Sequence, residues 1–438
     1  MIKIEFKRFF DLDFALIIPV VILMIIGILF IYSSGVDSSG VSVANEYIKQ
    51  IVWVSIGLVV FFLTALVDYR KFKDFSPWIF LIAMILLLYT VFFGKLVNGA
   101  KSWLGIGDFG IQPSEFAKIA FILFFSWFLI KSEKTDSDMS RFLKSLAILA
   151  VPLLLILAQP DLGTASVYIP VYLTMAFFAN IKIRYLGMVL LFGIFTVVFM
   201  VLPIWQEYIY ARQVPVLKIL TDNNIRLVVI ISLLVVTVLS LIGKIFTSKK
   251  IFYWISYFSG ILTFSLIASM VNVLQDYQIK RLIVFLNPYV DPQGSGWNII
   301  QSITAIGSGA IFGKGYLQGT QSHYRYLPQQ STDFIFSILS EEWGFVGGLV
   351  VFLLYAFILY RCINTMRHTR ELYGFYIIAG VSSMIFFHFV VNVGMAMGIM
   401  PITGIPLLFL SYGGSSLLTV LMALGLVLSI NSRRMDHI

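Results

Sequence analysis

Long apolar segments separated by short polar connections run through almost the whole chain. Each is close to the roughly 20 residues that a helix needs to cross a bilayer. Continuous apolar runs predict membrane helices rather than the alternating strands of a barrel, because a lone helix satisfies its own backbone in hydrocarbon. We therefore expect an all-α polytopic membrane protein with one transmembrane domain over 1–438. The twelve predicted spans are 12–33, 48–67, 76–93, 114–131, 145–159, 162–180, 185–204, 225–243, 251–273, 343–361, 374–396 and 412–430.

Composition agrees with this pattern. The chain is 59% hydrophobic and only 12% charged, about half the charged share of an average soluble domain. Its net charge of +9 is better explained by basic loops at a membrane surface than by nucleic acid binding. Cys362 is the only cysteine, so an intramolecular disulfide is excluded.

The distribution of Lys and Arg predicts the orientation. An even number of spans places both termini on one side, and Lys3, Lys7 and Arg8 precede the first span. With the termini in the cytoplasm, basic residues concentrate in the inner loops. The short outer loops then hold only Lys95, Lys101, Arg212 and Lys218. Segment 274–342 becomes a large extracytoplasmic loop.

Several outer segments have irregular, Gly/Pro-interrupted sequences. They include the loop 94–113, a tight turn at Gln159–Thr164, and a segment from Pro401 to Ser416 that is expected to dip toward the membrane. Such backbone is tolerated at membrane depth only where it is buried in protein or lines a wet cavity. We expect these segments to form one cavity with 277–343.

Glu115 and Lys118 are the first candidate pair, three residues apart on one predicted helix face. Glu115 alone is explained by a helix start after Pro113, where a carboxylate complements the helix dipole. Lys118 lies inside the apolar run, where charges usually face a partner or a cavity. The two residues could form a buried pair, or Lys118 could meet an anionic substrate.

Two aspartates allow both a structural and a chemical interpretation. Asp161 suits the N-cap of the sixth span, with Thr164 at the third helical position. Asp333 precedes a short amphipathic stretch that would place Ser337, Ser340 and Glu341 on the same face. It could likewise be a cap, or a carboxylate able to take a proton from a hydroxyl nucleophile.

The outer segment also carries cations and glycines. Lys280, Arg281, Lys314 and Arg325, together with the glycines of 307–315, would suit a phosphate or pyrophosphate. The glycine spacing matches no nucleotide-binding motif. His323 and His388 have no Cys or His at ligand spacing, so no zinc site is predicted.

Six motifs are distributed in order along most of the chain: Asn98-Gly-Ala-Lys-Ser-Trp103, Gln112-Pro-Ser-Glu-Phe-Ala-Lys118, Gln159-Pro-Asp-Leu-Gly-Thr164, Gly313-Lys-Gly315, Thr332-Asp-Phe-Ile-Phe336 and Ser411-Tyr-Gly-Gly-Ser415. Taken together, they resemble those of the SEDS family (RodA, FtsW and SpoVE). Segment 319–322 is more similar to the RodA branch.

The resemblance implies a peptidoglycan glycosyltransferase that polymerises lipid II outside the cytoplasmic membrane during cell elongation. The implied partners are a class B penicillin-binding protein and other membrane proteins of the elongation complex. Asp333 matches the family's essential aspartate, the expected general base. The residues expected to bind substrate are Glu115, Lys118, Arg281, Lys314, Asn98, Trp103, Gln112, Asp161, Thr332 and Ser411.

The chain departs from the family pattern twice. Gln329 stands where the family usually has Glu, so a second carboxylate near Asp333 is missing. The family has ten spans, which predicts an inserted helical hairpin within 185–250.

The expected reaction is an inverting transfer with undecaprenyl pyrophosphate as the leaving group. Lys118, Arg281 and Lys314 would stabilise the pyrophosphate. A divalent cation, Mg²⁺ or Mn²⁺, could assist, although no protein ligand set is apparent. The alternatives are a transporter that flips lipid II, which would need polar groups across the midplane, and a scaffold without activity.

Overall fold

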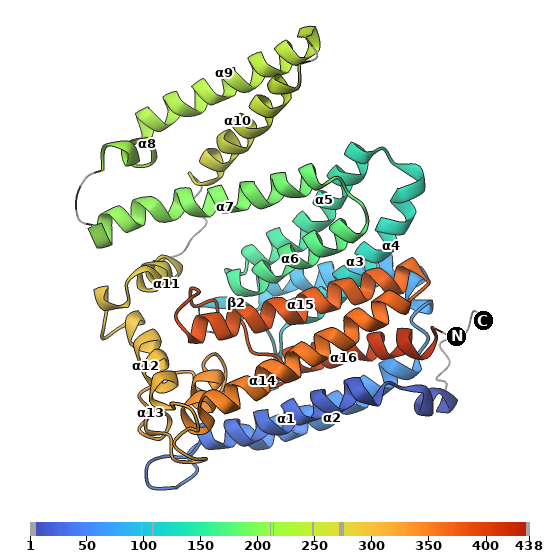
Figure 1. The fold of residues 1–438 in the computed structure, drawn as a ribbon, viewed down its shortest axis with the longest axis vertical. Helices are drawn as coiled ribbons and strands as arrows, with labels where there is room; N and C mark the ends of the chain where they lie inside the picture. The colour runs from blue at the N-terminus through green and yellow to red at the C-terminus, as the bar shows by residue number, and fades with distance from the viewer. Residues whose placement is uncertain are drawn as a thin grey trace. The chain divides into compact units, whose positions relative to one another are not determined.

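The computed structural model of the chain describes residues 6–97, 99–106, 109–210, 212, 214–247, 249–270 and 276–434 (Figure 1). Each of the twelve predicted spans falls on a helix in the part that is described; residues 271–273 of the predicted span 251–273 lie outside the described residues. In the described part, eleven helices are long and apolar enough to cross a membrane, and α6 is a shorter apolar helix. The twelve are α1 (Phe14–Ser34), α2 (Glu46–Leu66), α3 (Lys71–Phe93), α4 (Pro113–Thr135), α5 (Asp138–Leu157), α6 (Leu162–Phe178), α7 (Ile183–Trp205), α9 (Asn223–Thr247), α10 (Lys250–Ala268), α14 (Ile335–His368), α15 (Leu372–Ala396) and α16 (Gly414–Ser432).

Shorter elements occupy the connections. Three short antiparallel strands, in the order β1-β2-β3, lie between α3 and α4. Segment 274–342 is largely helical where it is described. The elements are η1 (Phe6–Asp11), β1 (Lys95–Val97), β2 (Ala100–Ile106), β3 (Phe109–Ile111), η2 (Gln206–Tyr210), η3 (Pro215–Leu217), α8 (Lys218–Thr221), α11 (Asp276–Leu286), η4 (Pro288–Val290), α12 (Ser295–Ser308) and α13 (Thr320–His323).

The chain forms two compact units. The first comprises residues 1–180 and 298–438, and the second comprises residues 181–297. The second unit contains the predicted hairpin of 185–250 together with the rest of α10 and with α11. That a hairpin within 185–250 is an insertion relative to the ten-span family pattern stays a prediction.

The core of the first unit is built around α16. Of its most apolar window, 94% is buried, so other helices rather than lipid surround it. It packs closely on α2: a Cβ at Gly425 would lie 1.9 Å from the Thr64 hydroxyl oxygen. Only a residue without a side chain permits that approach.

Segment 397–413, here called the buried loop, connects α15 to α16 without forming a helix. Ile405 and Leu407–Ser411 are buried inside the first unit. A Cβ at Gly27 of α1 would lie 2.6 Å from the Phe409 carbonyl oxygen, so α1 passes directly against this loop. The predicted irregular backbone of this segment is therefore confirmed, and protein covers it, as irregular backbone in a membrane protein requires.

The start of α14 is a short helix followed by a break. Gly344 has φ 65° and ψ −161°, a conformation open in practice only to glycine. A Cβ there would lie 2.3 Å from the Gly313 nitrogen. The predicted short helix before the span is thus confirmed, and the Gly-rich run 307–315 lies against the break.

Candidate functional site

Asp333 lies in a tight turn immediately before α14 and is half-buried. Its backbone N–H donates to the Gln329 carbonyl at 3.1 Å, and Gln329 has a φ of 53°. The Gln329 side-chain oxygen accepts from the Thr332 hydroxyl at 3.2 Å. Gln329 therefore shapes the turn that presents Asp333.

Two expectations about Asp333 are wrong. Phe334, not Asp333, occupies the N-cap of α14, and it makes no side-chain cap bond. Because Asp333 precedes the helix in a turn, it does not continue the predicted helical face of Ser337, Ser340 and Glu341. The cap interpretation of this aspartate is thereby removed.

Three hydrogen bonds hold the Asp333 turn to its surroundings. The Ser411 hydroxyl donates to the Thr332 carbonyl at 2.5 Å, and the Tyr412 N–H donates to the Ser331 carbonyl at 2.8 Å. The Asn392 amide donates to the Asp333 carbonyl at 3.0 Å. Thr332 and Ser411, which lie far apart in the sequence, are thus brought together around Asp333.

Asn392 and His388 are one helical turn apart on α15, and sequence reasoning missed the role of both. Asn392 also donates to the Ile405 carbonyl at 2.8 Å, and His388 Nδ1 lies 3.1 Å from the Pro406 carbonyl. Both side chains are almost completely buried. The available signal was two polar residues at i and i+4 inside an apolar helix, a spacing that places them on one inward face.

Glu115 and Lys118 form the predicted buried pair. The Lys118 ammonium lies 2.9 Å from each Glu115 carboxylate oxygen, and the two residues are 2% and 4% exposed. The ammonium also lies 3.1 Å from His388 Nε2. Because the Pro406 carbonyl can only accept, His388 Nδ1 must carry the proton, so Nε2 accepts from Lys118.

These contacts form one connected set. Lys118 holds His388, and His388 and Asn392 both bond the buried loop. Asn392 in turn holds the Asp333 turn. The ionic pair of α4 and the turn before α14 are therefore fixed to the same face of α15.

Gln112 and Asp161 also meet. Asp161 caps α6 by accepting from the Thr164 N–H at 3.0 Å, as predicted. The Gln112 amide donates to the other Asp161 oxygen at 2.8 Å, and the Gln112 N–H donates to the Ser415 hydroxyl at 3.0 Å. Asp161 thus joins α4 to α6.

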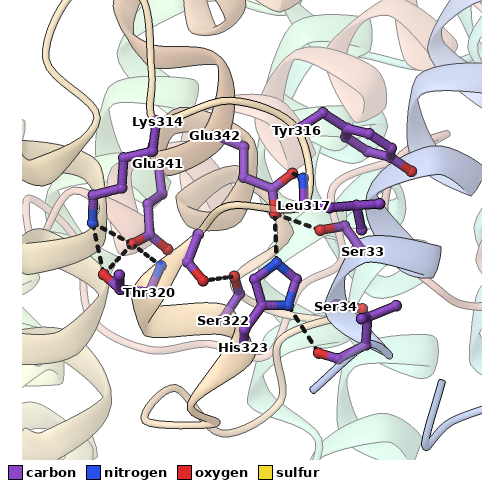
Figure 2. A network of polar contacts seen from close by, with 12 residues as sticks. Ser33, Ser34, Lys314, Tyr316, Leu317, Thr320, Ser322, His323, Glu341 and Glu342 are labelled. Atoms are coloured by element: carbon purple, nitrogen blue, oxygen red, sulfur yellow. Dashed lines mark hydrogen bonds and ion pairs between the residues drawn. The ribbon is translucent and has the colours of Figure 1, made fainter. Parts of the chain in front are cut away.

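Lys314 is paired with a buried acid. Its ammonium donates to Glu341 Oε1 at 2.7 Å and to the Thr320 hydroxyl at 2.7 Å (Figure 2). The same Glu341 oxygen accepts from the N–H groups of Thr320 and Gln321 at 2.8 and 3.0 Å. Lys314 therefore ties the Gly-rich run to α14, a role the sequence did not predict.

Glu342, next to Glu341, anchors a second set of contacts (Figure 2). Its carboxylate accepts from the Ser33 hydroxyl of α1 and from the Leu317 N–H. His323 Nε2 lies 3.6 Å from Glu342 Oε1, and His323 Nδ1 contacts the Val36 carbonyl at 2.9 Å. Burial raises the pKa of nearby Tyr316 to about 12, so its phenol stays protonated and donates to the Leu29 carbonyl.

The remaining predicted residues lie elsewhere. Trp103 is half-buried on β2, and its ring packs over Gly110 of β3. Arg281 lies on α11, in the second unit. Asn98 lies outside the described residues. Within the described ranges, no three His, Cys, Asp or Glu residues are grouped to hold a metal ion.

Comparisons with known proteins assign the chain to a family. The FtsW/RodA/SpoVE cell cycle protein family model matches residues 14–214 and 204–436. Peptidoglycan glycosyltransferase RodA of Treponema pallidum is 51% identical over 427 residues, covering 97% of this chain and 98% of the relative. Peptidoglycan glycosyltransferase MrdB of Escherichia coli is 31% identical, covering 98% and 96%.

Two solved structures share the fold. One, described as structural coordination of polymerization and crosslinking by a peptidoglycan synthase complex, has a TM-score of 0.66 at 24% identity, covering 97% of this chain and 99% of that one. RodA of Thermus thermophilus has a TM-score of 0.59 at 21% identity, covering 97% and 98%. The matched segments and the identity along nearly the whole length show that this multi-span membrane protein belongs to the FtsW/RodA/SpoVE family, the SEDS family.

Proposed function

We propose that the chain is a RodA-type peptidoglycan glycosyltransferase that polymerises lipid II during cell elongation. The observation that carries the proposal is the fixed Asp333 turn. Three backbone carbonyls in succession, from Ser331 to Asp333, are each held by a donor from the buried loop or from α15. Such support restrains the position of a carboxylate that must meet a substrate hydroxyl.

In the proposed reaction Asp333 is the general base. The 4-hydroxyl oxygen of the acceptor's GlcNAc forms a bond to C1 of the donor's MurNAc. The bond from C1 to the pyrophosphate oxygen breaks, and the hydroxyl proton passes to the Asp333 carboxylate. A positioned base of this kind typically contributes about 10²–10⁴-fold to the rate.

The structure changes the role that we propose for two of the three cations. Lys118 is buried on Glu115 and His388, and Lys314 is bonded to Glu341. We therefore infer that these two act by holding the buried loop and the Gly-rich run in place. Arg281 is kept as the candidate pyrophosphate contact.

The described residues do not fit a divalent cation held by the protein alone. Gln329, before Asp333, offers an amide where a carboxylate would be needed to bind the cation. Within the described residues, no three His, Cys, Asp or Glu side chains are grouped to hold a metal ion. The proposed reaction therefore has no step on a metal ion. Gln329 shapes the turn, and one carboxylate is sufficient for the proposed proton transfer.

Placement in the membrane follows from the charge distribution. We infer cytoplasmic termini, which put Asp333, the buried loop and Gln112 at the extracytoplasmic face of the cytoplasmic membrane. The similarity in fold to a peptidoglycan synthase complex supports a penicillin-binding protein as partner. Lipid II would be both donor and acceptor.

The rival function is transport of lipid II across the membrane. One experiment separates the two: purified protein in liposomes receives labelled lipid II, and both glycan chains and lipid II movement are measured. The proposal expects glycan chains from the wild type and none from Asp333→Asn. Movement of lipid II without polymer, unchanged in Asp333→Asn, would establish the transporter instead.

A further inference from the structure

Five basic residues gather at one end of the second unit. Lys182 and Arg184 lie at the start of α7, Lys244 lies in the last turn of α9, and Lys249 and Lys250 begin α10. The four acidic residues of 181–297 lie at other element ends: Glu207, Asp222, Asp276 and Asp291. Arg184 and Glu207 are separated by about 34 Å of helix at 1.5 Å per residue. Glu207 and Asp222 therefore lie at the opposite ends of α7 and α9 from Arg184 and Lys244.

Tyrosine rings hold two of these cations in place. The Arg184 guanidinium lies 5.0 Å from the Tyr185 ring centroid and 5.6 Å from that of Tyr253. The Lys244 ammonium lies 5.1 Å from the same Tyr253 ring, and the Tyr257 hydroxyl donates to the Arg184 carbonyl at 2.6 Å. Tyr253 thus joins the start of α7 to the end of α9. Aromatic faces attract cations without neutralising their charge.

The cluster borders an open recess next to apolar surface. The recess has a volume of about 330 Å³ and is lined by Lys182, Ile183 and Arg184. Ile183 is 71% exposed, and none of the most apolar window of α7 is buried. Arg184 Nε is buried and has no hydrogen-bond partner. A ligand for this surface needs a negative head and an apolar body.

The simplest explanation for basic residues at helix ends is that they set the orientation of the chain. That role requires charge alone and would be served equally by exposed lysines such as Lys249. It does not require that Arg184 and Lys244 share the Tyr253 ring, nor that Lys182 and Arg184 line a recess. The ordered part of the cluster is what distinguishes a binding site from an orientation signal.

We propose that Lys182, together with Arg184 and Lys244 on the Tyr253 ring, binds the phosphate headgroup of an anionic phospholipid. Clusters of four to eight basic residues beside a membrane helix attract anionic lipid, with about 1 kcal/mol, or roughly fivefold in affinity, from each. The acyl chains would lie along the exposed apolar surface of α7. The site contains none of the residues around Asp333 and does not depend on the transferase activity.

The test compares two charge-matched triple variants of the full-length protein. Lys182→Gln/Arg184→Gln/Lys244→Gln removes the cluster, and Lys71→Gln/Lys73→Gln/Lys134→Gln removes three basic residues of the first unit. Both are placed in nanodiscs of phosphatidylcholine containing a minor fraction of phosphatidylglycerol. Native mass spectrometry then measures the retention of phosphatidylglycerol relative to phosphatidylcholine.

We expect the wild type and the first-unit variant to retain phosphatidylglycerol selectively, and the cluster variant to lose about fivefold for each charge removed. A further variant, Tyr253→Leu, keeps every charge and should lower the selectivity if the ring arranges the cations. Equal loss in both triple variants, or loss in neither, overturns the proposal. Displacement of the lipid by millimolar glycerol 3-phosphate would overturn it in favour of a soluble anion.

Discussion

Removal of one member of the Glu115–Lys118 pair should destabilise the protein more than removal of both. Lys118→Met leaves the Glu115 carboxylate buried, and Glu115→Gln leaves the ammonium with only the neutral His388. Loss of one partner of a buried pair costs about 3–5 kcal/mol, because the other charge stays buried without compensation. The double variant has no charge; it leaves the neutral His388 Nε2 acceptor and the neutral amide at position 115 without Lys118, and unpaired neutral groups cost less, about 1–3 kcal/mol.

The single cysteine provides the assay. Cys362 is completely buried, so a thiol-reactive fluorophore labels it only when the helices open. The temperature at which Cys362 becomes labelled should be highest for the wild type, lower for the double variant and lowest for the single variants. Lys144→Met is a matched control, because Lys144 is exposed and pairs with Asp136 at 2.6 Å on the surface, where such pairs contribute at most about 1 kcal/mol. Its labelling temperature should stay near that of the wild type.

The reasoning would be refuted by additive effects. If the double variant lost as much stability as the two single variants together, the two charges would not compensate each other. If the labelling temperature of Lys118→Met equalled that of Lys144→Met, the buried pair would contribute no more to stability than a surface pair. Its contact with His388 would then not stabilise the protein.

Three further predictions concern the turn, the break and the orientation. Asn392→Asp removes the amide N–H donors that bond the Asp333 and Ile405 carbonyls, so the rate of lipid II polymerisation should fall at least tenfold. The control Asn224→Asp, at the start of α9, should leave that rate unchanged. Gly344→Ala forces a side chain into a positive-φ site 2.3 Å from the Gly313 nitrogen and should prevent accumulation of folded protein, while Gly193→Ala, with open space around it, should be tolerated. In intact cells an impermeant maleimide should label Val41→Cys but should label Lys249→Cys only after permeabilisation; the reverse pattern would contradict the orientation.

The helices were predictable because membrane spanning imposes a length and a composition that each segment carries by itself. The twelve predicted spans all became helices, and the Asp161 cap followed from local spacing. The Glu115–Lys118 contact was likewise readable, because residues three apart on a helix are neighbours.

Contacts between distant segments were not predictable in the same way. Lys314 meets Glu341 across 27 positions, and Lys118 meets His388 across 270. No local spacing encodes such pairs. From the sequence alone, Lys314 is therefore expected to meet a phosphate, and His388 has no evident side-chain partner. The cap interpretation of Asp333 failed because this residue lies in a turn closed on the Gln329 carbonyl, so α14 begins only at Ile335.

The most direct test of the central claim is the rate of lipid II polymerisation by purified Asp333→Asn protein. The matched control is Asp37→Asn, since Asp37 is a partly exposed aspartate whose carboxylate accepts from Ser39 and Val41 in its own turn. We predict that Asp333→Asn lowers the polymerisation rate by about 10²–10⁴-fold, with folding by Cys362 labelling unchanged and Asp37→Asn as active as the wild type. Polymerisation by folded Asp333→Asn at the wild-type rate would contradict the assignment of Asp333 as the general base.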